Sequence, residues 1–174
     1  VVHGTPSGID NTVVAHEEPV WFISGKPPRP FRSPARCHLV LGNTGIAAST
    51  GELVAGVRKR HDADPRLYDG YFAAIGALVR GARAALKEGE LARVGELMDG
   101  NHELLNSIGV GHPVLDELVA IARDAGALGA KLTGKGGGGN MVALTEGADG
   151  QAAVAQALTE AGYTAYETAF GGAT

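Results

Sequence analysis

Four consecutive glycines form the feature of this sequence that most directly suggests chemistry. They follow a Gly-Lys pair and lie between two stretches that are typical of β-strands. Residues without a Cβ atom adopt backbone angles closed to other residues, and they let an anion lie against main-chain N–H groups. The loop has neither Walker A spacing nor a GxGxxG pattern at the start of a helix. The pattern predicts phosphate contact by Gly134, Gly136, Gly137, Gly138 and Gly139, with a glycine-rich strand-to-strand turn as the alternative.

A second candidate lies near the start of the chain, in segment 6–10 (PSGID). Proline and glycine on either side of Ser7 fix a sharp loop, and Asp10 follows it. The carboxylate of Asp10 could accept a proton from a substrate hydroxyl. Serine and aspartate also bond their own backbone in ordinary turns, and the residues alone favour that turn interpretation.

The histidines and the single cysteine are weaker candidates. His102 and His112 flank a glycine-rich link and could line a pocket, but helix capping or a satisfied core position is the favoured interpretation. A hydrolase triad of Ser7, His112 and Asp116 can be written, yet no nucleophile elbow surrounds the serine. Cys37 lies in an apolar stretch with no His or Cys nearby at zinc-ligand spacing, so we predict a small buried hydrophobic residue there.

Apolar periodicity and turn residues predict the elements that hold these candidates in place. Strands are predicted over 12–15, 20–23, 37–41, 130–133, 141–144 and 163–168. Helices are predicted over 50–59, 67–86, 91–106, 113–125 and 150–161, whereas segment 25–30 contains three prolines and is expected to be irregular. This order predicts one α+β domain over 1–174, made of an extended part (1–45), a helical run (49–126) and a closing part (129–174). Helices are expected on one face of a mainly antiparallel sheet.

Composition and charge argue against several classes of function. The chain is 44% hydrophobic and 20% charged, which suits a globular core, and it has no apolar run of about 18 residues that would cross a membrane. A formal net charge of -4 and scattered basic residues argue against a nucleic-acid surface. The single cysteine excludes an internal disulfide framework and suits a reducing cytoplasm. The sequence begins directly in a dense turn segment, from which we expect a piece of a longer protein.

Four segments together resemble the mevalonate kinases, a branch of the GHMP family of small-molecule kinases. The order along the chain is the order found in that family, and the resemblance runs from residue 2 to about residue 144. The segments are 3–11 (HGTPSGIDN), 43–58 (beginning NTG and ending LVAGVR), 101–112 (NHELLNSIGVGH) and 129–139 (GAKLTGKGGGG). The PSGID stretch is shared by other GHMP kinases, whereas HGT before it and the GVGH link favour the mevalonate kinases.

The resemblance implies a fold and a reaction. The fold is a ferredoxin-like C-terminal domain, and the reaction transfers the γ-phosphoryl group of ATP to the 5-hydroxyl of mevalonate in isoprenoid synthesis. By resemblance Asp10 is the general base, or the carboxylate that orients the hydroxyl. Ser7 and Thr44 lie beside the substrate, and the glycines of 134–139 border the phosphates.

The same resemblance implies parts that this sequence does not contain. In the family an N-terminal domain binds ATP and supplies the Ser and Glu ligands of Mg²⁺, and no segment here matches it. We therefore assign no metal ligand and expect these 174 residues to be inactive alone. A homodimer is a further implication of the family.

Two departures and two alternatives remain open. Lys135 and Asn140 replace residues that are usually small in the family's glycine loop, and Lys135 could reach a phosphate or point to solvent. One alternative is a sister enzyme, such as a mevalonate 3-kinase or a phosphomevalonate kinase. The other is a non-catalytic binding module, against which the intact Asp10 argues.

Overall fold

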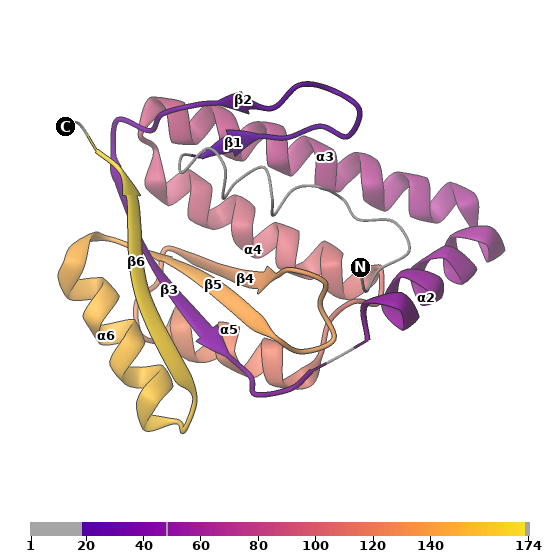
Figure 1. Cartoon of the computed structure of the whole chain (residues 1–174). Coiled ribbons are helices and arrows are strands. Elements are labelled where there is room, and N and C mark those ends of the chain that lie inside the picture. The colour runs from indigo at the N-terminus through magenta and orange to yellow at the C-terminus, as the bar shows by residue number, and fades with distance from the viewer. Residues whose placement is uncertain (1–18, 48, 173–174) are drawn as a thin grey trace.

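The computed structural model describes residues 19–47 and 49–172. Figure 1 shows a sheet with long helices above it and two further helices packed against it from below. In that figure the described helices begin at α2. The elements are β1 (Val20–Trp21), β2 (Arg29–Pro30), β3 (Arg36–Asn43), α2 (Thr50–Ala63), α3 (Pro65–Glu88), α4 (Leu91–Ser107), α5 (Pro113–Asp124), β4 (Gly129–Thr133), β5 (Asn140–Thr145), α6 (Gly147–Glu160) and β6 (Thr164–Gly171).

The main sheet has four strands in the order β4-β5-β3-β6, and each neighbouring pair is antiparallel. Along the chain the order is strand, helices, strand, strand, helix, strand, which is the ferredoxin-like pattern. The predicted α+β class is therefore confirmed. This topology places the end of β3 beside the start of β5, because Asn43 pairs with Asn140 in the register of the two strands.

One face of the sheet carries the larger core. Apolar side chains of β3, β4 and β5 meet those of α5 and α6 there, among them Val40, Leu118, Met141 and Leu158, all fully buried. Gly42 lies on this face, where a Cβ atom would come within 2.9 Å of a Leu118 methyl carbon. A side chain at position 42 would therefore push α5 away from the sheet.

The opposite face is also covered by helices, a difference from the single covered face expected from the sequence. Val40 lies three positions after Cys37, and side chains an odd number of positions apart in a strand point to opposite faces. Cys37 is fully buried in a second cluster with Leu144, Ala85 of α3 and Val94 of α4. The prediction that Cys37 is a small buried hydrophobic residue is confirmed, and burial raises the pKa of its thiol.

Side chains of helix α4 accept hydrogen bonds from the backbone N–H groups at the outer edge of β4. The Ala130 N–H donates to Asp99 Oδ1 over 2.8 Å, and the Leu132 N–H donates to His102 Nδ1 over 3.2 Å. These two donors point away from β5, because alternate N–H groups of an antiparallel strand face alternate sides. Side chains of a helix thus take the place of a fifth strand on this side of the sheet.

Local capping signals explain most helix boundaries. Asp64 accepts a hydrogen bond from the Leu67 N–H over 3.1 Å and begins α3, in which Pro65 occupies the first turn. Gly89 ends the helix with φ of 77°, in the left-handed region where glycine is favoured. Helix α2 runs to Ala63 rather than to residue 59, because the first backbone position that cannot stay helical is Asp64, which precedes a proline.

The proline-rich segment contains a short strand that the sequence analysis did not predict. Trp21 pairs with Arg29 and Val20 with Pro30 in a two-stranded antiparallel sheet, closed by a hydrogen bond from the Phe31 N–H to the Pro19 carbonyl over 3.0 Å. The expectation of an irregular segment over 25–30 was wrong at its last two residues. A two-stranded sheet has only edge strands, and a proline is tolerated there because one side of the strand needs no donor.

Candidate active site around the glycine loop

The glycine loop connects β4 to β5 and requires glycine for conformational reasons. Five of its residues have φ between 69° and 125°, a region that L side chains rarely adopt; they are Gly134, Gly136, Gly137, Gly138 and Gly139. An ordinary two-residue hairpin turn needs one or two such positions. The loop therefore follows a path that other residues could not follow.

Two glycines are required by close packing as well. A Cβ atom on Gly136 would overlap the carbonyl oxygen of Val110, and one on Gly138 would lie 2.8 Å from the carbonyl oxygen of Ile46. Val110 belongs to the link between α4 and α5, and Ile46 follows β3. The loop is thus held between two segments that are remote in sequence.

Hydrogen bonds fix the loop to the same two segments. The Gly137 N–H donates to the Val110 carbonyl over 2.8 Å, and the Gly139 N–H donates to the Ile46 carbonyl over 2.9 Å. Both donors are occupied by protein acceptors. Of the five glycines predicted to contact phosphate, this leaves Gly134, Gly136 and Gly138 as candidate N–H donors. For these three the role stays a prediction.

Thr44 lies next to the loop and is joined to it by its hydroxyl group. Thr44 Oγ1 donates to the Gly139 carbonyl over 3.0 Å and accepts from the Ile46 N–H over 3.1 Å. The Thr44 N–H donates to the same Gly139 carbonyl over 2.8 Å. These bonds place Thr44 at the site, while its predicted contact with substrate stays a prediction.

Two asparagines cross-link the strands at the edge of the site. Asn43 Nδ2 donates to Asn140 Oδ1 over 2.6 Å, and Asn43 Oδ1 accepts from the Gly45 N–H over 2.7 Å. The unusual Asn140 of the sequence is thus the partner of Asn43 across β3 and β5. Neither residue was a predicted site residue, because the pairing depends on strand register.

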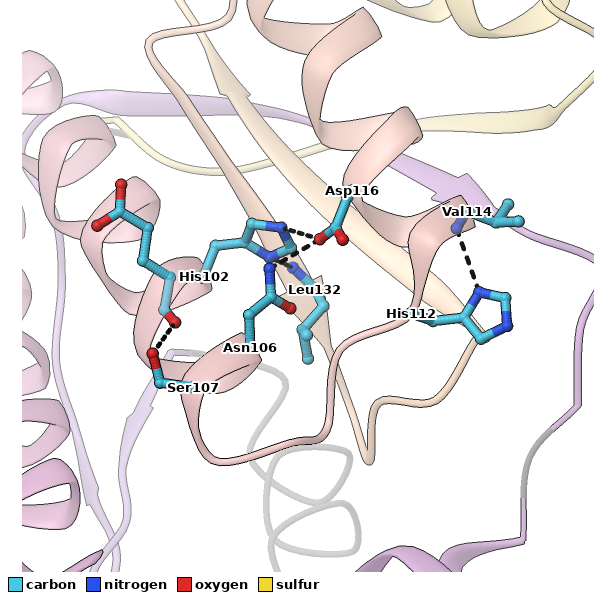
Figure 2. A network of polar contacts seen from close by, with 8 residues as sticks. His102, Asn106, Ser107, His112, Val114, Asp116 and Leu132 are labelled. Atoms are coloured by element: carbon cyan, nitrogen blue, oxygen red, sulfur yellow. Dashed lines mark hydrogen bonds and ion pairs between the residues drawn. The ribbon is translucent and has the colours of Figure 1, made fainter. Parts of the chain in front are cut away.

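The link between α4 and α5 is supported by a polar network, shown in Figure 2. His102 is buried, and its Nδ1 accepts from the Leu132 N–H, so the neutral ring carries its proton on Nε2. His102 Nε2 then donates to Asp116 Oδ1 over 2.9 Å, and Asn106 Nδ2 donates to the same oxygen over 2.8 Å. His112 Nδ1 caps α5 by accepting from the Val114 N–H. The favoured interpretations of His102 as a satisfied core residue and His112 as a cap are confirmed.

Arg60 also holds this link, and the sequence analysis did not identify it. Its Nη2 donates to the carbonyls of Ile108 and Gly109 over 2.9 and 3.2 Å, and its Nε donates to the Tyr68 hydroxyl over 3.0 Å. The guanidinium group therefore fixes the backbone that precedes Val110. No local signal in the sequence could reveal this role, because the acceptors lie 48 and 49 residues away.

The remaining predicted site residues cannot be placed. Ser7 and Asp10 lie outside the described residues. Among residues 19–47 and 49–172 no group of three or more His, Cys, Asp or Glu side chains could hold a metal ion. Nor does any described helix have the length and apolar character needed to cross a membrane.

Comparison with known proteins identifies the family. The sequence profile described as GHMP kinases C terminal matches residues 82–164. The chain belongs to the GHMP kinase family and carries its C-terminal domain. Within that family it is similar to mevalonate kinases. It is 45% identical to the mevalonate kinase of Pyrococcus horikoshii over 161 residues, which make up 89% of this chain and 47% of the relative.

Two further relatives extend this similarity. The human mevalonate kinase is 37% identical over 181 residues, covering 98% of this chain and 45% of the relative. The crystal structure of L. major mevalonate kinase in complex with R-mevalonate superposes with a TM-score of 0.91 at 35% identity, covering 99% of this chain and 55% of that one. The chain thus spans about half the length of the relatives it matches.

Proposed function

We propose that this domain is the part of a mevalonate kinase that supplies the catalytic carboxylate and the glycine loop. The reaction would transfer the γ-phosphoryl group of ATP to the 5-hydroxyl of mevalonate. The observation that carries the proposal is the similarity to the L. major enzyme, which was crystallised with R-mevalonate and matches nearly the whole chain at 35% identity. The chain covers about half of each relative, and by the family resemblance ATP would be bound by an N-terminal part of the complete enzyme.

Asp10 would act on the substrate hydroxyl. Its carboxylate would accept the hydroxyl proton, or orient the oxygen for in-line attack on the γ-phosphorus. Ser7 would lie beside it as a substrate contact. The sequence around both residues, PSGID, supports these roles by resemblance.

The glycine loop would position the phosphates. Phosphoryl transfer depends mainly on positioning and on stabilisation of charge, so a rigid wall is useful. The hydrogen bonds from Gly137, Gly139 and Thr44 keep this loop in one conformation before any ligand arrives. The N–H groups of Gly136 and Gly138 would then meet phosphate oxygens without reorganisation.

Mg²⁺ would be held outside the described residues, and it would neutralise phosphate charge when bound. We further infer that the 174 residues do not phosphorylate mevalonate alone, that the complete enzyme forms a homodimer, and that it works in the cytoplasm as part of isoprenoid synthesis. The single buried cysteine is compatible with a reducing compartment.

The test is ADP release by the complete gene product, with mevalonate, 5-phosphomevalonate, homoserine and galactose offered in parallel. We expect turnover on mevalonate alone and a loss of about 10²–10⁴-fold in Asp10→Asn. Asp124→Asn is the matched control, because Asp124 is exposed at the end of α5. Turnover on another substrate would keep the family and overturn the substrate. No turnover on any of the four would favour a binding module, and mevalonate-dependent ADP release by the 174 residues alone would overturn the inference of an inactive part.

A further inference from the structure

A cavity of about 300 Å³ lies under the β1–β2 hairpin, away from the glycine loop. Trp21 and Phe31 of the hairpin region form one wall, and Leu78 and Leu86 of α3 with Met98 of α4 form much of the rest. Figure 1 shows the hairpin lying along α3, with α4 below it. The volume is at the lower end of the range found for small-molecule sites.

Three nitrogen groups interrupt this apolar lining. Asn101 is nine-tenths buried, and its Nδ2 has no hydrogen-bond partner in the part of the chain that the structure describes. Arg83 Nε is also buried and lacks a partner there. Lys131, at the base of the cavity, has its Nζ bonded to the Leu132 carbonyl over 2.6 Å.

Among the described residues that line the cavity, none balances the positive charges of Arg83 and Lys131. None of the described residues that line it is acidic. The Arg83 guanidinium carbon lies 4.5 Å from the centre of the Trp21 ring, a cation–π contact that orients the group but brings no negative charge. Burial lowers the pKa of Lys131 to about 8, as expected for an ammonium group without a carboxylate partner.

Buried donors without partners are rare in folded proteins, because their loss of water is uncompensated. Two of them, beside a lysine and around one apolar space, form a site that an anion would complete. The apolar walls require that the rest of the ligand be hydrophobic. The small volume limits it to a short chain or a single ring.

We propose that this cavity binds a small amphipathic anion, whose carboxylate or phosphate head accepts hydrogen bonds from Arg83 and Asn101 and whose apolar body packs against Trp21 and Leu78. Such a site does not depend on the kinase reaction. Its ligand would differ from a nucleotide, for which the space is too small.

The test uses the full 174-residue chain and its single tryptophan, which lines the cavity. Octanoate and octyl phosphate are titrated separately, with octanol as the uncharged control. Trp21 fluorescence and isothermal titration calorimetry are read in parallel. We expect saturable binding of at least one anion, with binding of octanol at least about 10-fold weaker, because a charged hydrogen bond is lost. The tighter of the two anions identifies the head group.

Variants separate binding from folding. Arg83→Met retains the apolar stem and should weaken the anion about 10-fold or more, whereas Arg80→Met, on an exposed position of the same helix, should leave binding unchanged. Asn101→Leu should weaken binding at an unchanged or higher Tm, since it removes an unpaired buried amide. Equal binding of octanol and octanoate, equal effects of the two arginine variants, or no saturable binding of either anion would overturn the proposal.

Discussion

Replacing Gly136 with alanine perturbs the point at which the glycine loop meets the α4–α5 link. The residue has φ of 82°, and an added Cβ atom would overlap the Val110 carbonyl oxygen. The left-handed backbone costs an alanine about 1–2 kcal/mol. Displacing the Val110 carbonyl also breaks its bond from the Gly137 N–H, which contributes about 0.5–1.5 kcal/mol. We therefore expect a loss of about 2–3 kcal/mol in the free energy of unfolding.

Gly134→Ala provides the matched control, because its φ of 77° is similar but no atom lies within 4 Å of the added Cβ. It should cost only the backbone part, about 1–2 kcal/mol. Urea unfolding followed by circular dichroism measures the free-energy loss of each variant. In thermal unfolding, the Tm should fall by about 2–4 °C for each kcal/mol lost. Equal losses in the two variants would refute the argument that close packing, in addition to backbone angle, selects glycine at position 136.

Three further changes test the surroundings of the loop. Thr44→Val removes both hydroxyl bonds and should cost about 1–3 kcal/mol in urea unfolding, whereas Thr44→Ser should cost less than half of that. His102→Leu leaves the Leu132 N–H without a partner and removes one of the two donors to Asp116 Oδ1, and it should cost about 1–3 kcal/mol; a neutral effect would contradict the network of Figure 2. The hydrogen bond to Asp69 raises the pKa of His61, so its stabilising effect is fully present below the unfolded pKa and lost as pH rises through the folded pKa. Asp69→Asn should therefore lower the Tm more at pH 5.5 than at pH 8, and a pH-independent difference would exclude this pair as the cause.

The sequence predicted elements well where the determining signals are local. Asp64-Pro65 and Gly89 set the ends of α3 through capping and backbone preference, which depend on residues within one helical turn. The strand at Arg29–Pro30 was missed because a weak pairing with Val20–Trp21 outweighs the proline penalty at an edge.

The site was predictable in part. The glycine loop was found because an unusual run of glycines occurs between two predicted strands, whereas Thr44 was found only through the family resemblance. Arg60 and the Asn43–Asn140 pair were not, because their partners lie 48 and 97 residues away and are brought together only by the fold. Gly136 packs against Val110, and Gly138 packs against Ile46. These contacts likewise depend on the fold, and a run of identical glycines does not reveal them.

The covered edge of β4 also affects how copies of this domain can associate. An exposed strand edge offers unpaired N–H and C=O groups to a strand of another molecule. At β4 the N–H groups of Ala130 and Leu132 are already bonded to Asp99 and His102. A strand of another molecule would therefore pair more readily with the other edge of the described sheet, β6. There Glu167 provides a charge that discourages uncontrolled edge-to-edge pairing. Loss of the His102 ring would free the Leu132 N–H at this second edge, and a folding defect there would be accompanied by aggregation.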